Sequence, residues 1–192
     1  MVLPEFRSMR PDGRAAFCGR SGDPAGQLAT SRLRLAPLTV ADADEMSGVL
    51  SDSRLYTFIG GTAPSATELR ARYARLAVGR SPDGSQVWHN WIVRTLAGEA
   101  VGTVQATVVD GGTRAEVAWV IGQPYWGRGY ASEAAVAVVD WLAATGVGEV
   151  LAHIHPGHRA SQSVAERAGL RPTDVFQDGE QRWVRRFGPG SQ

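Results

Sequence analysis

The sequence contains no lysine, and all 20 of its basic residues are arginine. A P-loop nucleotide-binding site needs a lysine directly after its last glycine, so the sequence excludes that class of domain. Enzymes that form a Schiff base, pyridoxal-phosphate enzymes among them, use a lysine amine and are excluded as well. The simplest origin of the arginine bias is a GC-rich coding sequence, and we assign it no function.

Cysteine and long apolar runs are also scarce. The single cysteine, Cys18, cannot form a disulfide within the chain, which fits a reducing cytoplasm. No apolar run reaches the ~20 residues of a membrane span, and the first residues lack the compact apolar segment of a signal peptide. A net charge of +1 over 192 residues argues against strong electrostatic binding to nucleic acid. We therefore expect a cytoplasmic protein that binds neither a membrane nor nucleic acid.

Composition and periodicity divide the chain into a leader, one folded domain and a tail. Residues 1–30 are rich in Gly, Pro, Ser and Arg, which predicts a flexible leader, and residues 188–192 are predicted to be disordered. Between them, residues 31–187 alternate between strand-like and helix-like patterns. The expected elements are a strand at 32–35, helices at about 39–50 and 65–79, strands at 88–95, 100–109 and 114–121, a helix at 131–145, a strand at 149–155, a helix at 159–168, and a hairpin of 174–177 with 181–187.

A strand, a glycine-rich turn and a helix follow one another between residues 117 and 145, and this stretch carries the most chemical information. The first amides of a helix have no intrahelical partner, and the helix dipole adds partial positive charge there. With Gly127 and Gly129 allowing a close backbone approach, the turn is suited to a phosphate or pyrophosphate. The dinucleotide-binding fingerprint needs a third glycine, but residue 132 is serine.

Two motifs in this half of the chain resemble those of the GNAT (general N-acetyltransferase) superfamily. Residues 125–134, Tyr-Trp-Gly-Arg-Gly-Tyr-Ala-Ser-Glu-Ala, resemble its pyrophosphate loop in the form YWGxGYAxEA of the ribosomal-protein (RimJ/RimL-type) branch. Residues 155–170 resemble the run HPDNxxSxxVAEKxGF of the same branch. The resemblance extends over roughly Ser31 to Phe187, and the order of the expected elements is that of the GNAT fold.

The resemblance implies an α/β fold with a mixed sheet flanked by helices. In it, the neighbouring parallel strands 114–121 and 149–155 splay apart, and acetyl-CoA, the acyl-donor cosubstrate, lies in the gap. The pantetheine arm pairs with the backbone of the first strand, and the pyrophosphate binds the amides of the loop. His158 replaces an asparagine that helps to order the turn and the cofactor. The implied cofactor-binding residues are Trp119, Val120, Ile121, Trp126, Gly127, Arg128, Gly129, Tyr130, Ala131, Ser132 and His158.

The resemblance also implies candidates for acid–base chemistry. Relatives often place a carboxylate at the position of Glu116 to deprotonate the acceptor amine; otherwise Glu116 is a surface residue at a strand edge. Many relatives protonate the departing thiolate with a tyrosine, but Ala165 stands at that position here. Ser161 is the nearest alternative by motif, unless water or the departing amine supplies the proton. Glu133, just inside the long helix, is predicted to be structural.

Several readings remain open from the sequence. The acceptor can be a protein N-terminus, an aminoglycoside-like amine or a polyamine, and the chain can be a monomer or a homodimer. Tyr56, Phe58 and Tyr73 either line the acceptor pocket or belong to the core. A metal site is not expected, because His153, His155 and His158 do not make a complete tetrahedral ligand set. The alternative functions are a non-catalytic acyl-CoA-binding module and an unrelated phosphate-binding domain.

Overall fold

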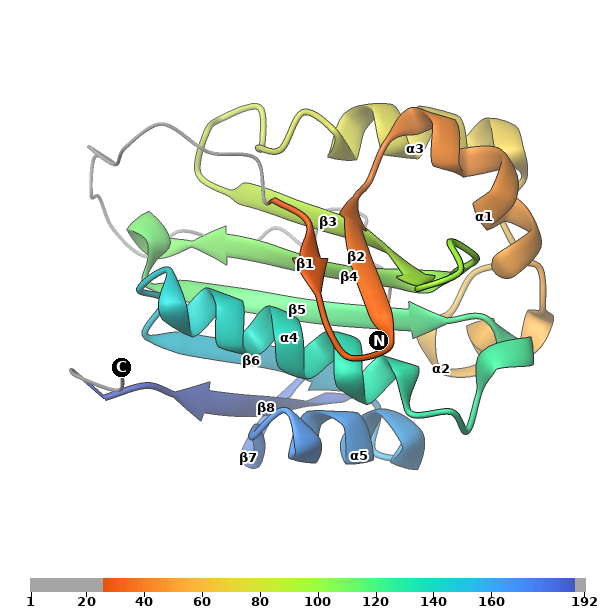
Figure 1. Ribbon diagram of the computed structural model, residues 1–192. Coiled ribbons are helices and arrows are strands. Elements are labelled where there is room, and N and C mark those ends of the chain that lie inside the picture. Colours follow the sequence, from red (N-terminus) through yellow and green to blue (C-terminus); the bar gives the residue numbers. More distant parts are fainter. Residues whose placement is uncertain (1–25, 189–192) are drawn as a thin grey trace.

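The structure, a computed structural model, describes residues 26–188. In these residues eight strands form one mixed sheet in the order β1-β2-β3-β4-β5-β6-β8-β7 (Figure 1). The strands are β1 (Leu28–Ala29), β2 (Leu33–Pro37), β3 (Val87–Thr95), β4 (Ala100–Val109), β5 (Arg114–Ile121), β6 (Glu149–Ile154), β7 (Arg171–Gln177) and β8 (Glu180–Arg186). The α-helices are α1 (Ala43–Val49), α2 (Tyr56–Ile59), α3 (Ala66–Leu76), α4 (Tyr130–Ala144) and α5 (Arg159–Arg167).

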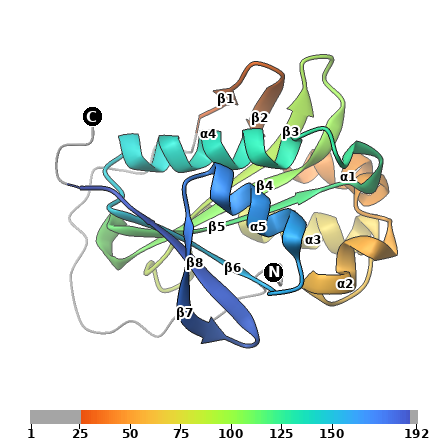
Figure 2. The same ribbon diagram turned by 90° about the horizontal axis from the view of Figure 1, so that it is seen from below.

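Helices cover both faces of the sheet, as Figures 1 and 2 show together. Helix α4 packs on one face against β5, with α5 beside it, whereas α1 and α3 lie on the other face over β4. Alanine and valine dominate α4, so a broad apolar surface lies against the sheet and the helix can approach closely. Its buried residues are Ala134, Ala135, Val138, Val139 and Leu142. None of the helices in residues 26–188 is long and apolar enough to span a membrane.

Local sequence signals predicted most of these elements. Strand β5 has the bounds expected for it, and the capping box of Ser65 and Glu68 opens α3. Asp178 and Gly179 have positive φ angles of 51° and 80°, as a tight two-residue hairpin turn requires, and they join β7 to β8. The mixed α/β fold class expected from the sequence is therefore confirmed.

The N-terminal boundary of the folded part needs a correction. Strand β1 lies inside the predicted leader, because Leu28 pairs with Leu35 of β2 and packs against the core. The Trp91 indole also donates a hydrogen bond to the Gly26 carbonyl, 3.1 Å away. The rest of the leader, with Cys18, and the tail from residue 189 lie outside the described residues. Helix α2 is a second departure, since it occupies a predicted loop.

Strands β5 and β6 form the only parallel pair in the described part of the chain, and they separate after a short contact. Three residue pairs join them, the last being Glu116 with Leu151. Beyond it β5 continues to Ile121 along β4 alone, while β6 continues along β8. One edge of β5 therefore faces a gap, and this gap positions the candidate site.

Candidate functional site

Backbone groups of β5 point into the gap at alternate residues. The Gly122 amide donates to the Val101 carbonyl of β4, at 2.9 Å. Backbone groups alternate in direction along a strand, so those of Trp119 and Ile121 face away from β4 and into the gap. The Ile121 carbonyl accepts a hydrogen bond of 2.7 Å from the Trp126 indole, which fastens the following loop to the end of the strand.

Val120 differs from the prediction that its backbone lines the gap. A Cβ at Gly102 of β4 would lie 2.2 Å from the Val120 carbonyl oxygen, so this oxygen points toward β4. The Val120 side chain lines a pocket under α1 and α3, on the face of the sheet away from α4. Of the three predicted backbone contacts, the strand geometry therefore leaves available the backbone of Trp119 and the amide of Ile121, whose carbonyl is bonded to the Trp126 indole.

The loop after β5 presents backbone amides at the start of α4. Gly127 and Gly129 have φ angles of 74° and 78°, values that favour glycine, and Gly129 is the N-cap of the helix. The amides of residues 127–132 have no hydrogen-bond acceptor within the described part of the chain, whereas the Trp126 amide donates to the Gln123 carbonyl at 3.2 Å. Free amides and the helix dipole together make this loop a candidate anion site.

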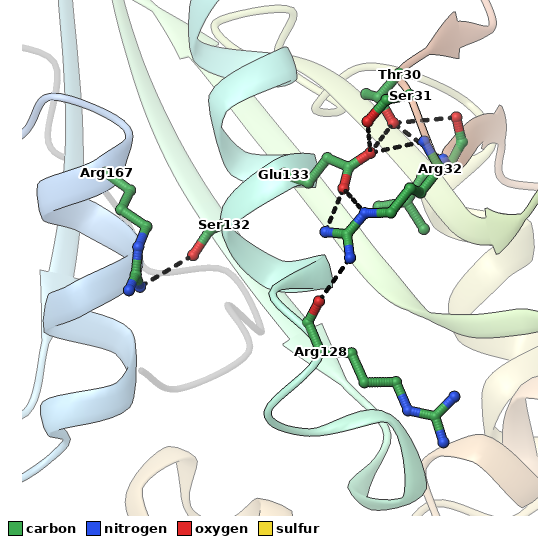
Figure 3. A network of polar contacts seen from close by, with 8 residues as sticks. Thr30, Ser31, Arg32, Arg128, Ser132, Glu133 and Arg167 are labelled. Atoms are coloured by element: carbon green, nitrogen blue, oxygen red, sulfur yellow. Dashed lines mark hydrogen bonds and ion pairs between the residues drawn. The ribbon is translucent and has the colours of Figure 1, made fainter.

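Glu133 fastens this loop to the turn before β2, as Figure 3 shows. Its carboxylate accepts hydrogen bonds from the Thr30 hydroxyl at 2.5 Å, the Ser31 hydroxyl at 3.2 Å and the Arg32 amide at 2.9 Å. The Arg32 guanidinium donates to the same carboxylate at 2.7 Å and to the Arg128 carbonyl at 2.9 Å. Burial raises the pKa of Glu133, but the hydrogen bonds from Thr30 and Arg32 lower it more, so the pKa is below its ordinary value.

Three arginine side chains, including that of Arg32, lie around the loop between β5 and α4. The Arg32 guanidinium lies 5.2 Å from the centre of the Tyr130 ring, and that of Arg128 lies 5.8 Å from the Tyr125 ring. Arg167 of α5 reaches the Ser132 hydroxyl at 3.5 Å (Figure 3). These positive groups add to the field of the helix terminus and favour a ligand with several negative charges.

On the other side of the gap, Glu116 contacts a histidine that sequence reasoning did not select as a site residue. The Nδ1 atom of His153 on β6 lies 2.9 Å from Oε1 of Glu116. The side chain of His153 is 3% exposed and that of Glu116 is 22% exposed. Because Glu116 pairs with Leu151, the residue two positions later on β6 lies on the same face of the sheet. The parallel register, which the sequence does not state, is the missing signal.

The turn after β6 carries the second motif and packs against α2. The ring of His158, at the N-cap of α5, stacks on Phe58 with 4.6 Å between centroids, and His155 lies against the same ring at 5.4 Å. Burial lowers the pKa of His158, which favours its neutral form. The structure thus places the predicted cofactor residue His158 beside α2. Ser161 lies on the first turn of α5 and is 4% exposed.

The three aromatic residues proposed for the acceptor side have different places. Tyr73 lines the pocket under α1 and α3, together with Arg72 and Gln105. Burial raises the pKa of Tyr73 to about 12, so its hydroxyl stays protonated at neutral pH. Tyr56 is a core residue whose hydroxyl donates to the Leu50 carbonyl at 2.8 Å.

Among the residues that the structure describes, no three acidic, histidine or cysteine side chains gather as a metal site would need.

Residues 32–171 match the family model described as "Acetyltransferase (GNAT) domain". The "Uncharacterized protein YkkB" of Bacillus subtilis (strain 168) is 28% identical over 162 residues, which cover 75% of this chain and 84% of that protein. The "Uncharacterized N-acetyltransferase p20" of Bacillus licheniformis is 23% identical over 155 residues, which cover 80% and 86% respectively.

Solved structures share the fold. The structure of "RimL- Ribosomal L7/L12 alpha-N-protein acetyltransferase in complex with Coenzyme A" superposes with a TM-score of 0.70 at 14% identity, covering 83% of this chain and 97% of that one. The family model covers well over half of the sequence, from Arg32, directly before β2, to Arg171, the first residue of β7. The chain therefore belongs to the GNAT family of acetyltransferases.

Proposed function

We propose that this protein transfers an acetyl group from acetyl-CoA to a primary amine, by direct attack within a ternary complex. The observation that carries the proposal is the gap between β5 and β6, which has the anion-binding loop at one end and Glu116 at the other. A single extended ligand with a polyanionic head and a reactive thioester fits that layout. Solved structures of the same fold include complexes with acetyl-CoA or coenzyme A.

The donor is assigned to the gap and the loop. The pyrophosphate would accept hydrogen bonds from the amides of residues 127–132, with the nearby arginines balancing its charge. The pantetheine arm would pair with backbone groups of Trp119 and Ile121, in the way a peptide adds a strand to an open sheet edge. This arrangement would place the thioester near the point where β5 and β6 separate.

Glu116 is the proposed general base. A lysine-like amine has a pKa of ~10.4 and is mostly protonated at neutral pH, but only the neutral amine attacks a thioester. Glu116 would take one proton from the amine, directly or through water. The neutral amine nitrogen would then attack the carbonyl carbon, the carbon–sulfur bond would break, and the second proton lost by the nitrogen would pass to the CoA sulfur, through the Ser161 hydroxyl or through water. Neither motif contains a cysteine, so we expect no acyl-enzyme intermediate.

Ser161 is the proposed donor of the proton to the CoA thiolate. It stands on the first turn of α5, and the tyrosine that many relatives use is replaced by the buried Ala165. Ser161→Ala should lower turnover without changing acetyl-CoA affinity if the hydroxyl supplies the proton. Equal turnover of the variant and the wild type would assign this step to water or to the departing amine.

The experiment that tests the function combines binding with turnover. Acetyl-CoA that binds the native state should raise the melting temperature, and thiol release should accelerate when a suitable amine is added. The amine panel should include a peptide N-terminus, as expected for the RimJ/RimL-type branch, and small amines. Binding without turnover for any amine would indicate a non-catalytic acyl-CoA-binding module. The absence of binding at saturating acetyl-CoA would contradict the proposal altogether.

A further inference from the structure

The contact between Glu116 and His153 fixes how the proposed base is held. The histidine ring is almost fully buried on β6, and β6 is paired residue by residue with β8 as far as Ile154. Its ring therefore has little freedom to turn. The carboxylate of Glu116 is more exposed and stands at the last paired position of β5, where the strands begin to separate. One rigid side chain thus contacts the group that must meet the acceptor.

Geometry determines which ring nitrogen carries the proton. A neutral imidazole has one donor and one acceptor nitrogen. If Nδ1 were the acceptor, its lone pair would face a carboxylate oxygen only 2.9 Å away, which is repulsive. Nδ1 therefore carries the hydrogen and donates it to Oε1 of Glu116. The remaining carboxylate oxygen, Oε2, has no hydrogen-bond partner among the described residues and is free to accept a proton.

We propose that His153 is the positioning residue of the acceptor side, holding Glu116 in one orientation through Nδ1–H so that Oε2 points at the incoming amine. The proposal rests on the proposed function, because it assumes that Glu116 is the base. His153 touches neither the donor nor the acceptor itself. Its removal leaves Glu116 present but able to turn, and misplacement of a catalytic group by about 1 Å can cost ~10²-fold in rate.

Two substitutions of nearly equal shape separate this role from simple packing. In His153→Asn the side-chain amide nitrogen lies close to the former Nδ1 position and can still donate to Glu116. His153→Leu has a similar shape but no donor. We expect the leucine variant to lose on the order of 10–100-fold in kcat, with little change in acetyl-CoA affinity, and the asparagine variant to retain most of the activity.

His89→Leu is the matched control, because His89 is also a partly buried histidine of the sheet but packs against Trp141 on the α4 face. It should cost stability without the loss in kcat. In a Glu116→Gln background, His153→Leu should add almost nothing, since both changes disable the same unit. Equal losses in the Asn and Leu variants, or a full additional loss in that background, would overturn the proposal.

One readout does not depend on turnover. Nitrogen-15 NMR of the histidine rings, with His153 assigned from the His153→Asn variant, reports which nitrogen is protonated. We expect the Nδ1–H form for His153, and a change in its shifts in Glu116→Gln. An Nε2–H form would refute the positioning role even in an active enzyme. A correct Nδ1–H form in a protein that turns over no amine would instead identify the proposed function as the failed assumption.

Discussion

The two sides of the gap present different kinds of chemical group to a ligand. The donor side, comprising the end of β5, the loop of residues 122–129 and the first turn of α4, offers mainly backbone amides from one continuous segment. The proposed acceptor side consists of side chains from separate strands, with Glu116 on β5 and His153 on β6. A backbone site tolerates many side chains as long as the chain can turn, whereas the acceptor side changes whenever a single residue changes.

This difference agrees with the chemistry proposed for each side. The proposed donor has the same pyrophosphate and pantetheine arm whatever its acyl group, so a site made from main-chain groups suffices to bind that part. The acceptor varies, and function depends on side chains placed on a common fold. The two sides should therefore respond to substitution in separable ways: loop changes should act on acetyl-CoA affinity, and changes at Glu116 should act on turnover.

Glu116→Gln should give the largest effect. Glutamine keeps the shape and can still accept the hydrogen bond from His153, but it cannot take a proton from the amine. We expect turnover to fall by roughly 10²–10⁴-fold, the usual share of general base catalysis, while acetyl-CoA affinity measured by calorimetry stays near that of the wild type. An unchanged turnover number with a good acceptor would mean that the amine loses its proton to solvent, and that Glu116 is an ordinary strand residue.

Gly129→Val should act on acetyl-CoA affinity, whereas Glu116→Gln acts on turnover. A β-branched residue at a φ of 78° is strained, and its side chain would press on Arg32 and on the approach of a phosphate. We expect acetyl-CoA binding to weaken on the order of 10–100-fold, equivalent to about 1.4–2.8 kcal/mol. Gly146→Val is the matched control, because Gly146 has a φ of 96° just beyond the other end of α4 and open space around it.

Both glycine variants should lose similar stability in thermal unfolding, of about 1–3 kcal/mol for the strained backbone. Only the Gly129 variant should lose affinity. A comparable loss of affinity in the Gly146 variant would show that strain in α4, and not access to the loop amides, controls binding of the donor.

The same contrast explains what the sequence could predict. Gly127, Gly129 and the strand before them are neighbours in the chain, so spacing alone could indicate this loop as a candidate anion site. The pair of Glu116 and His153 depends on the register between β5 and β6, and the direction of the Val120 carbonyl depends on the alternation set by β4. Neither register is written in local periodicity. The correction at β1 has the same origin, because its support includes contacts made about a hundred residues later in the chain.

Arg32→Ala should give a smaller, mixed effect on the donor side. The substitution removes the ion pair with Glu133 and the hydrogen bond to the Arg128 carbonyl, while the Thr30 and Ser31 contacts remain. Arg32 is 52% exposed, and exposed ion pairs contribute only about 0–1 kcal/mol. We expect a slight fall in melting temperature and a fewfold weaker binding of acetyl-CoA, measured by calorimetry.

Arg34→Ala is the control for the loss of one positive charge two residues further along the chain, on β2, since the side chain of Arg34 donates a 3.3 Å hydrogen bond to the Leu96 carbonyl, away from the loop. It should leave affinity unchanged. If both variants weaken binding equally, the effect of Arg32 is one of overall charge, and the contact with the loop backbone adds nothing.

Glu133 should produce the smallest effect, visible as a dependence of stability on pH. Its pKa in the folded protein lies below the ordinary value, because the hydrogen bonds from Thr30 and Arg32 outweigh the effect of burial. A carboxyl whose pKa is lowered on folding stabilises the native state above its unfolded pKa of ~4.3, and this contribution is lost as the pH falls toward the folded pKa. As the pH falls from about 5 through the folded pKa, the wild type should therefore lose more stability than Glu133→Gln, which has no proton to gain there. Asp52, Asp83 and Glu68, whose pKa values are lowered chiefly by side-chain hydrogen bonds, contribute equally to both proteins and cancel in the difference.

Parallel curves of melting temperature against pH for the two proteins would mean that the Glu133 carboxylate is not preferentially stabilised in the folded state. The turn before β2 would then owe its position to the pairing of β1 with β2 alone.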